Sequence, residues 1–388
     1  MTNGAGSPTG RANGVGLWRW ATPHAQAILA KRELGTILRY HRQLHGLSQA
    51  ALGAQLGYDK TYISLLENGR RSIPDVASRR RIAGVLGLPA HVLGVTDAAD
   101  TDFEAMLQFG DSTVRLGEIA RQSGHATDAV NELWPLVARL EARVVDGHTE
   151  REVLALLARA RVGLGVALGH VLPEERLATA ARWTGKGLAI ARRLDDHGFH
   201  VHALRMHGNE LRKAGLLEAA LDRLRRAHSL ARTPADRAAA LALLARAAGS
   251  AGRQRLFDEA VAGNRRLLDE TAHTSLFNPF ALHEILLRGL AATGRAVEAV
   301  RLLDSSPGPG MQTTPQWRII EHITVGHVLL LQGDQPAAQE HLREAVFGAQ
   351  VHRLPHQLQR VLRIAPTLPA IHEQAAACLQ SLREQLAA

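Results

Sequence analysis

The stretch from Asp59 to Thr61 places polar side chains at the start of an expected helix. Asp59 is of a residue type that caps a helix N-terminus, and Lys60 follows it directly. The first turn of a helix carries partial positive charge and disfavours a cation, so Lys60 breaks a local rule. A residue that does so without a structural gain is a candidate for function. The chemistry that Lys60 and Thr61 offer at this position is binding through charge and hydrogen bonds.

Other residues that could do chemistry lack the partners that it needs. Of His197, His200, His202 and His207, only the first two have the spacing of a metal-binding pair on a helix, and no HExxH occurs. The glycines of "LGVALG" and "GSAGRQ" do not follow a strand, so a phosphate loop is not expected. Cys378 lies in an alanine-rich terminal segment and is interpreted as a packing residue. We expect no metal, no cofactor and no enzymatic activity.

Composition predicts an almost entirely helical protein. The 388 residues suggest two or three domains. The chain is 46% hydrophobic but only 4% aromatic, alanine and leucine dominate, and windows rich in β-branched residues are absent. One cysteine excludes an internal disulfide and fits a reducing cytoplasm. No run of 18 apolar residues occurs, so we expect no membrane span.

Positive charge is concentrated near the N-terminus. Residues 1–96 hold 12 Lys and Arg against 4 Asp and Glu, whereas the whole chain has a net charge of +9. This asymmetry indicates that the N-terminal part meets a polyanion, either nucleic acid or an acidic membrane. The alternative is a basic surface that only keeps the protein in solution.

Short helices separated by tight turns are predicted in the basic segment. They are expected at 34–44, at 49–56 after Ser48, after Asp59 as far as Asn68, at about 75–86, and in a short turn at "AHVLGV". The first 16 residues are rich in Gly, Ser, Asn and Pro, so residues 1–30 are expected to form a flexible tail. Trp18 and Trp20 are expected to dock on the folded domain.

The segment "LSQAALGAQLGYDKTYISLLENGRR" has the features of a helix-turn-helix. Gly53 is placed at the helix crossing and Gly57 in the turn. The apolar contacts are expected from Leu52, Leu56, Ile63 and Leu66. The segment resembles the Xre or lambda-repressor class closely, including Gln49 and "ENGRR", over residues 34–95. The resemblance implies a DNA-binding domain at 31–96.

The same resemblance implies which residues contact DNA. The second motif helix of this class lies in the major groove, which explains a lysine at its start. Near the bases it would place Lys60, Thr61, Tyr62 and Ser64; on phosphates it would place Gln49, Asn68, Arg70 and Arg71. Tyr62 could instead cover the core. Arg42 and Glu67 correspond to an ion pair between helices, and Arg79, Arg80 and Arg81 are interpreted as a solvated face.

The remainder of the chain contains a degenerate repeat. Its element, Gly-x6-Gly-x4-Ala-x3-Leu, occurs at Gly117, Gly208 and Gly326, and without the first glycine at Gly294. The pattern resembles tetratricopeptide repeats, which implies an α-solenoid. Further pairs are expected at 152–195 and 235–271, giving six pairs and a C-terminal cap at 355–387. We expect a linker at 97–110 and the repeat domain at 111–388; a generic helical bundle is the alternative.

Tetratricopeptide geometry would place polar stripes on the inner surface of such a solenoid. One stripe holds Arg205, Asn209 and Arg212, and equivalent positions give Glu284, Arg288 and His327. Asn can hold a peptide backbone and Arg a carboxylate. The alternative is an internal network of salt bridges between repeats.

This architecture resembles the peptide-receptor regulators of Gram-positive bacteria and similar regulators of actinobacteria. The resemblance implies a cytoplasmic, nucleoid-associated transcription factor that binds a pseudo-palindromic operator as a homodimer. The repeats would sense a peptide or small molecule, and no membrane is expected as a partner. The alternative is an interaction scaffold that sequesters a protein, with DNA binding secondary.

Overall fold

The computed structural model describes residues 20, 23–88, 90–95, 101–145, 151–274, 276–303, 305 and 314–387. Over these residues the secondary structure is helical, with no strand, as predicted. Clustering of contacts divides the chain into two compact units. The first comprises residues 1–113, 130–153 and 388, and the second comprises 114–129 and 154–387.

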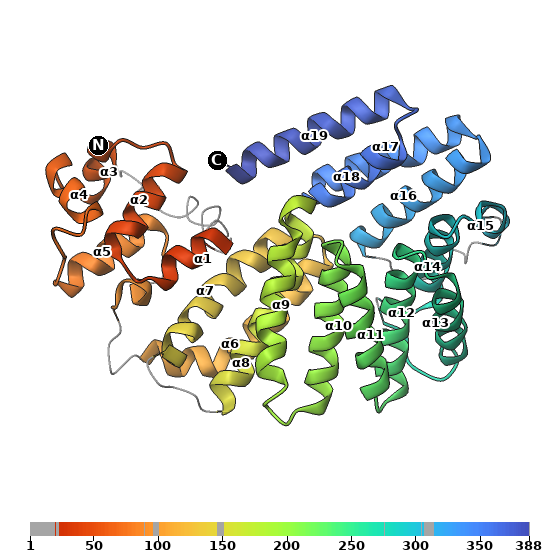
Figure 1. Cartoon of the computed structure of the whole chain (residues 1–388), viewed down its shortest axis with the longest axis horizontal. Helices are drawn as coiled ribbons and strands as arrows, with labels where there is room; N and C mark the ends of the chain where they lie inside the picture. Colours follow the sequence, from red (N-terminus) through yellow and green to blue (C-terminus); the bar gives the residue numbers. More distant parts are fainter. Residues whose placement is uncertain are drawn as a thin grey trace, which may run out of the picture. The chain divides into compact units, whose positions relative to one another are not determined.

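The N-terminal domain consists of short helices joined by tight turns (Figure 1). They are α1 (Pro23–Ala30), α2 (Leu34–Leu44), α3 (Gln49–Leu56), α4 (Lys60–Glu67), α5 (Val76–Leu86) and the 3-10 helix η2 (Ala90–Leu93). The helices predicted from 34 to 93 are confirmed. Local chemistry sets their bounds: the Ser48 side chain accepts from the Ala51 N–H, and Asp75 accepts from Ala77 and Ser78.

The expected flexible tail ends earlier than residue 30. Residues 23–30 form α1, which packs on α2, so the prediction was wrong for them. The reason is Trp20, which is 2% exposed, donates from Nε1 to the Leu86 carbonyl at 3.1 Å and stacks on His41. The expected docking of Trp20 is thus confirmed, and Trp18 lies outside the described residues.

The remaining helices follow one another in pairs. They are α6 (Thr101–Gln122), α7 (Ala126–Val145), α8 (Arg151–Val171), the 3-10 helix η3 (Glu174–Arg176), α9 (Leu177–Ala191), α10 (His197–Lys213), α11 (Leu217–Leu230), α12 (Pro234–Ser250), α13 (Gln254–Leu267), α14 (Pro279–Ala292), α15 (Ala296–Leu303), α16 (Pro315–Gln332), α17 (Gln335–Val351), α18 (Pro355–Ile364) and α19 (Pro369–Ala387). The pairs expected at 152–195 and 235–271 are present, as is the terminal pair. The linker expected at 97–110 is wrong from Thr101 onward, because α6 begins there.

Equivalent contacts recur in different pairs of the second unit. A Cβ added to Gly208 of α10 would lie 2.7 Å from Leu224 Cγ in α11, and one on Gly326 of α16 would lie 2.8 Å from Leu342 Cγ in α17. The small residue therefore lets two antiparallel helices approach, with the leucine between them. The repeat read from the sequence is a repeat in three dimensions for these two pairs.

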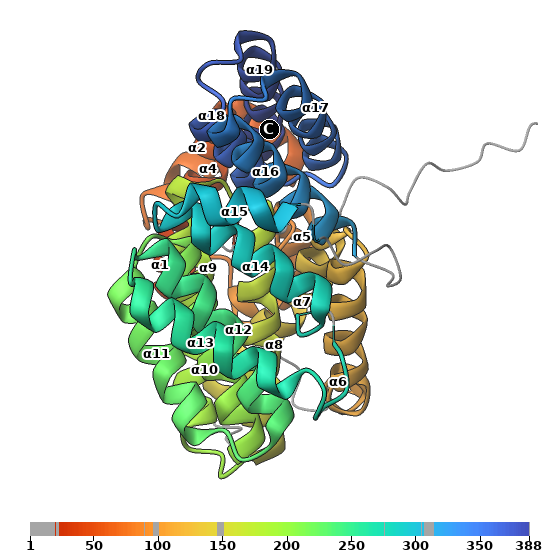
Figure 2. The same ribbon diagram turned by 90° about the vertical axis from the view of Figure 1, so that its right-hand side faces the viewer.

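Small residues also bring neighbouring pairs together. A Cβ on Gly249 of α12 would lie 3.1 Å from the Cα of Gly289 in α14. Figure 2 shows α12, α13 and α14 side by side, and each contacts the other two. The first helices of successive pairs therefore line up, which gives the second unit an inner row of helices.

The last pair contacts the beginning of the second unit. The Glu174 N–H of η3 donates to Gln359 Oε1 of α18 at 2.8 Å. His356 of α18 contacts the His170 carbonyl at 3.2 Å, and Arg383 of α19 pairs with Glu175 at 2.8 Å. The terminal pair of the second unit thus returns to its early helices, and the inner helices line a common space.

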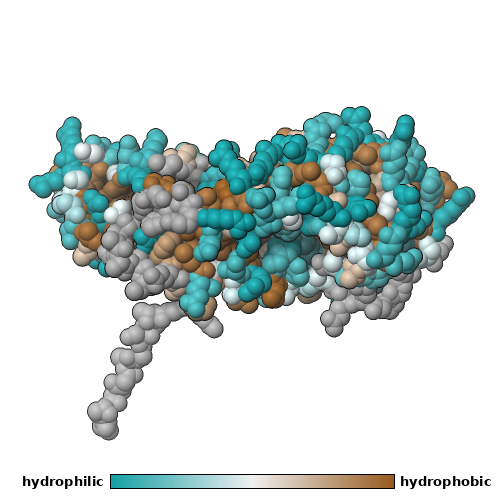
Figure 3. Space-filling model, turned by 90° about the horizontal axis from the view of Figure 1, so that it is seen from below, coloured by the Kyte–Doolittle hydropathy of each residue, from teal (hydrophilic) through white to brown (hydrophobic). Residues whose placement is uncertain are grey.

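Hydrophilic side chains predominate on the face seen in Figure 3, with hydrophobic ones scattered among them. Among the described helices, only α8 is long and apolar enough to cross a membrane by length and composition. Of its apolar window, 72% is buried inside the protein, as for a core helix.

Candidate functional site

The crossing of α3 and α4 depends on two glycines. A Cβ on Gly53 would lie 2.5 Å from the Tyr58 carbonyl oxygen, so only glycine allows this approach. Gly57 ends α3 in the left-handed region with φ +71°. The predicted apolar contacts are confirmed, because Leu52, Leu56 and Ile63 are fully buried and Leu66 is 2% exposed. The two glycines and the buried apolar residues therefore fix the packing of α4 against α3.

The N-terminus of α4 presents two residues to solvent. Asp59 caps it by accepting from the Tyr62 N–H at 2.7 Å. Lys60 and Thr61 are exposed, and within the described residues their side chains make no hydrogen bond or ion pair. Ile63, Leu66 and Glu67 of the same helix are buried. The outward face of the first turn is thus available for a ligand, and burial does not explain its residue types.

Tyr62 and Ser64 lie beside this exposed turn and are half-buried. The ring of Tyr62 stacks on Tyr58 at 4.8 Å between centroids, and Arg81 lies 5.2 Å over the Tyr58 ring. Ser64 is 3.5 Å from the Asn68 amide. Tyr62 therefore covers part of the domain, as the alternative interpretation predicted, and its side chain remains partly exposed.

The four candidate phosphate contacts have different surroundings. The Gln49 amide donates to Glu67 at 3.0 Å. Asn68 accepts from Arg39 at 3.1 Å and follows the last residue of α4. Arg70 and Arg71 are exposed, and their side chains have no partner within the described residues. The two arginines are thus free to bind an anion, whereas Gln49 and Asn68 already serve the domain.

Arg42 and Glu67 form the ion pair that the sequence indicated. Arg42 Nε is 2.7 Å from Glu67 Oε1, and the carboxylate is nearly buried. Burial alone would raise the pKa of Glu67, but the hydrogen bonds from Arg42 and Gln49 lower it overall. The pair is structural and joins α2 to α4.

The predicted solvated face of α5 is confirmed for Arg80 and Arg81, which are exposed, and wrong for Arg79, which is half-buried. Arg79 donates to the Ile73 carbonyl at 2.5 Å, and Arg81 donates to the Leu56 carbonyl at 2.6 Å. Arg79 thus holds the segment before α5, and Arg81 satisfies a carbonyl at the end of α3.

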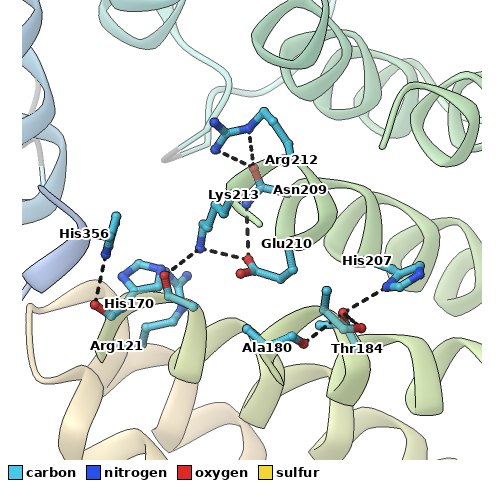
Figure 4. A network of polar contacts seen from close by, with 12 residues as sticks. Arg121, His170, Ala180, Thr184, His207, Asn209, Glu210, Arg212, Lys213 and His356 are labelled. Atoms are coloured by element: carbon cyan, nitrogen blue, oxygen red, sulfur yellow. Dashed lines mark hydrogen bonds and ion pairs between the residues drawn. The ribbon is translucent and has the colours of Figure 1, made fainter. Parts of the chain in front are cut away.

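A second candidate site lies among the inner helices of the second unit. It is a cavity of about 420 Å³, lined from α6, α8, α10, α12, α14, α16 and α18. Of the predicted stripe, Asn209, Arg212, Arg288 and His327 line it. Its polar contacts include Lys213 between Glu210 and the Gly169 carbonyl of α8 (Figure 4). Four residues of the expected inner surface therefore meet in one cavity, whose lining combines charged and apolar side chains.

Two stripe residues lie outside the cavity lining and belong to internal ion pairs. Arg205 faces Asp236 at 3.6 Å, and Glu284 pairs with Arg288 at 3.2 Å while accepting from Thr324 at 3.0 Å. For Arg205 and Glu284 the alternative interpretation, a salt-bridge network, fits the structure. Arg288 takes part in both the network and the lining.

Five further cations of the cavity were not predicted from the sequence, namely Arg121, Lys213, Arg246, Arg360 and Arg363. A positional signal could have identified one of them. Asn209, Arg246, Arg288 and His327 each stand six residues before a glycine with positive φ, namely Gly215, Gly252, Gly294 and Gly333. Once Gly252 is recognised as a repeat turn, Arg246 falls in the series.

The histidine group of α10 is used in packing. His197 Nε2 contacts the Leu230 carbonyl at 2.7 Å, and His207 contacts Thr184 at 3.1 Å. Burial is the main cause that lowers the pKa of His202 and of His207 to about 4. In the described part of the chain no three His, Cys, Asp or Glu are grouped to hold a metal.

Comparisons with known proteins bear on the N-terminal domain. Residues 33–93 match the family model described as a helix-turn-helix domain. Together with the α3–α4 geometry, this match shows that the N-terminal domain is a helix-turn-helix domain. No curated protein is significantly similar to the chain.

Among solved structures, the chain is similar to the crystal structure of Bacillus thuringiensis PlcR in complex with the peptide PapR7 and DNA. The two are 15% identical, and the alignment covers 88% of this chain and 99% of that one. The TM-score is 0.31, which does not establish a common fold for the whole length.

Proposed function

We propose that this protein is a sequence-specific DNA-binding transcriptional regulator and not an enzyme. The observation that carries the proposal is the N-terminus of α4. Within a helix-turn-helix domain, the first turn of the second motif helix exposes Lys60 and Thr61, which have no protein partner in the described chain. Such a turn is the part of the motif that meets base edges in the major groove.

The roles of the individual side chains follow from their chemistry. Lys60 donates to guanine O6 and N7 or to a phosphate, and Thr61 hydrogen-bonds or offers its methyl group to thymine. Tyr62 and Ser64 lie next to them on α4 and contact sugar or phosphate. Arg70 and Arg71 neutralise phosphates beyond the end of the helix. Gln49 and Asn68 would contact phosphates through side-chain amides that hydrogen bonds to Glu67 and from Arg39 already orient.

The second unit is proposed to control DNA binding. Its cation-lined cavity supports a sensor role, because a cavity of a few hundred cubic ångströms suits a small ligand. A homodimer on a pseudo-palindromic operator is part of the proposal, since dimers of this class place their half-sites about one helical turn apart. The proposed location is the cytoplasm, on the nucleoid.

Selection of bound sequences from random DNA by the full-length protein, at a stated salt concentration, tests the proposal. We expect enrichment of a pseudo-palindrome whose half-sites lie about 10 base pairs apart, centre to centre. Lys60→Ala should change the enriched bases. If neither the folded wild-type protein nor its residues 1–100 alone enrich a sequence at any salt concentration, the regulator is excluded and a protein-binding scaffold takes its place.

A further inference from the structure

The cavity of the second unit is lined by cations and by no carboxylate. Its charged lining consists of Arg121, Arg212, Lys213, Arg246, Arg288, Arg360 and Arg363. His170, His327 and His356 are also in the lining, and no Asp or Glu is among the described residues that form it. Seven cations around about 420 Å³ repel one another, so the empty cavity is electrostatically unfavourable.

Four of these cations form ion pairs with carboxylates that are not part of the cavity lining. Lys213 Nζ is 2.9 Å from Glu210, and Arg288 is 3.2 Å from Glu284. Arg121 pairs with Glu118, and Arg363 pairs with Glu174. These pairs hold four cations in place and offset their charge.

The other three cations have only neutral partners in the described structure. Both Nε and Nη2 of Arg212 donate to the Asn209 side-chain oxygen, at 3.3 and 3.2 Å (Figure 4). Arg360 donates to Gln357 at 2.9 Å, and the Arg246 guanidinium lies 5.4 Å over the ring of Trp317. Hydrogen bonds and a ring fix the orientation of these guanidiniums. The charges of Glu284 and, for Arg212 and Arg246, of Glu210 act on them without forming an ion pair, and compensate them only in part.

Burial makes this lack of charge compensation costly. The Nε atoms of Arg246 and Arg288 are buried and have no hydrogen-bond partner. Burial and then the charge of Arg288 lower the pKa of Arg246 to about 10. The same two causes, burial first, hold the pKa of Arg360 well below its usual range. An unpaired buried charge is strongly unfavourable, and anionic groups in the cavity would offset this cost.

The cavity lining also contains apolar side chains. Met206, Leu243, Leu276, Trp317 and Ile320 belong to it, interspersed with the cations. A purely inorganic anion would leave these side chains uncovered, whereas an organic ligand with a nonpolar portion would cover them. The charged and apolar residues together define the ligand class.

We propose that the cavity binds a compact organic polyanion, with at least two phosphate or carboxylate groups held by Arg212, Arg246 and Arg360 and its nonpolar part against Trp317. Guanidinium groups match both kinds of anion by paired hydrogen bonds. That this molecule acts as the effector rests on the proposed function; its binding does not. The limited volume favours a small molecule over an extended acidic peptide.

Calorimetric titration of the full-length protein, free of nucleic acid and in a chloride buffer of constant ionic strength, tests the binding. The probes are inorganic pyrophosphate, citrate, adenosine triphosphate and tetraglutamate. We expect adenosine triphosphate, pyrophosphate or citrate to bind once per chain. Tighter binding of pyrophosphate than of citrate identifies a phosphate ligand, and the reverse order a carboxylate ligand. Binding of tetraglutamate alone would overturn the proposal in favour of an acidic peptide.

The double variant Arg246→Gln, Arg360→Gln should weaken binding by about tenfold or more, because two of the uncompensated donors are removed. Arg255→Gln is the matched control, since Arg255 is 93% exposed on α13 and pairs with Glu259 of the same helix. Without ligand, the double variant should unfold at a higher temperature than the wild type, because buried repulsion is relieved. This shift also shows that the variant is folded.

Unchanged binding in the double variant, or no binding of any probe to the wild type, would overturn the proposal. Operator affinity measured with and without the bound probe separates the two claims. Binding that leaves operator affinity unchanged would uphold the polyanion site and contradict its control of DNA binding.

Discussion

Glu67 of α4 accepts two hydrogen bonds from Arg42 of α2, from Nε at 2.7 Å and from Nη2 at 3.0 Å. Gln49 of α3 donates a third at 3.0 Å, so one carboxylate joins three helices. The Glu67 side chain is 2% exposed and that of Arg42 is 21% exposed. A carboxylate buried to this degree depends on its partners to remain charged. The pair therefore maintains the frame on which the DNA-facing turn rests.

Arg42→Ala should destabilise the N-terminal domain by about 2–4 kcal/mol, because it leaves Glu67 buried with Gln49 as its remaining side-chain donor. Hydrogen exchange of the full-length protein measures this, with loss of protection expected in α2, α3 and α4. Arg71→Ala is the control, since that side chain is exposed and has no partner in the described chain. Equal protection in both variants would contradict a structural role for the ion pair.

Gly53→Ala and Gly84→Ala should change stability in opposite directions. A Cβ on Gly53 would lie 2.5 Å from the Tyr58 carbonyl oxygen, and backbone must move to relieve that clash, at a cost of about 1–3 kcal/mol. A Cβ on Gly84 of α5 would meet nothing within 4 Å, so alanine should stabilise the helix by about 0.5–1 kcal/mol. Hydrogen exchange of α3 and α5 amides measures both. Stabilisation by Gly53→Ala would show that the crossing tolerates a side chain.

The N-terminal domain could be predicted from the sequence because its signals are local. Ser48, Asp59 and Gly57 each set a helix end through a contact within a few residues of the chain. The extent of the tail was wrong because contacts distant in sequence order residues 23–30. Trp20 was expected to dock, but its bond to Leu86 and the bond of Arg81 to Leu56 leave no periodic pattern that locates them.

The cavity could be predicted only in part for the same reason. Repeat spacing placed Asn209, Arg212, Arg288 and His327 on the inner face, because equivalent positions face the same way in each pair. Arg360 comes from the terminal pair, which the closure of the array brings beside η3. No spacing in the sequence encodes that closure, so only the structure shows that Arg360 lines the cavity.

Lys60→Ala should weaken operator binding by about 1–3 kcal/mol and broaden the bases accepted at one position of each half-site. Arg71→Ala should instead weaken binding to all sequences equally. It should also reduce the slope of log affinity against log salt concentration by about one, because one fewer phosphate is neutralised. Sequence selection followed by affinity measurements at several salt concentrations distinguishes the two. A Lys60→Ala protein with unchanged affinity and unchanged preference would remove this residue from the interface.

Acidification should destabilise the second unit through buried histidines of α10. His207 contacts Thr184 at 3.1 Å, and His202 lies 3.5 Å from Arg205. Burial, followed by the charge of Arg205 on His202 and of Arg223 on His207, lowers each pKa to about 4. An unfolded histidine has a pKa near 6.5, so between about pH 6.5 and 4 the unfolded chain binds protons that the folded chain does not. The stabilising effect of each neutral histidine is therefore fully present above about pH 6.5. It decreases as the pH is lowered from there towards 4, by up to about 3 kcal/mol per histidine.

Denaturant unfolding of the full-length protein from pH 7.5 to 5 measures this slope. His207→Gln should reduce the slope by nearly one proton, because one of the buried histidines with a lowered pKa is removed. His372→Gln, at an exposed position of α19, should leave it unchanged. A profile equally steep in wild type and His207→Gln would show that His207 takes up its proton in the folded protein, and that its burial does not hold it neutral.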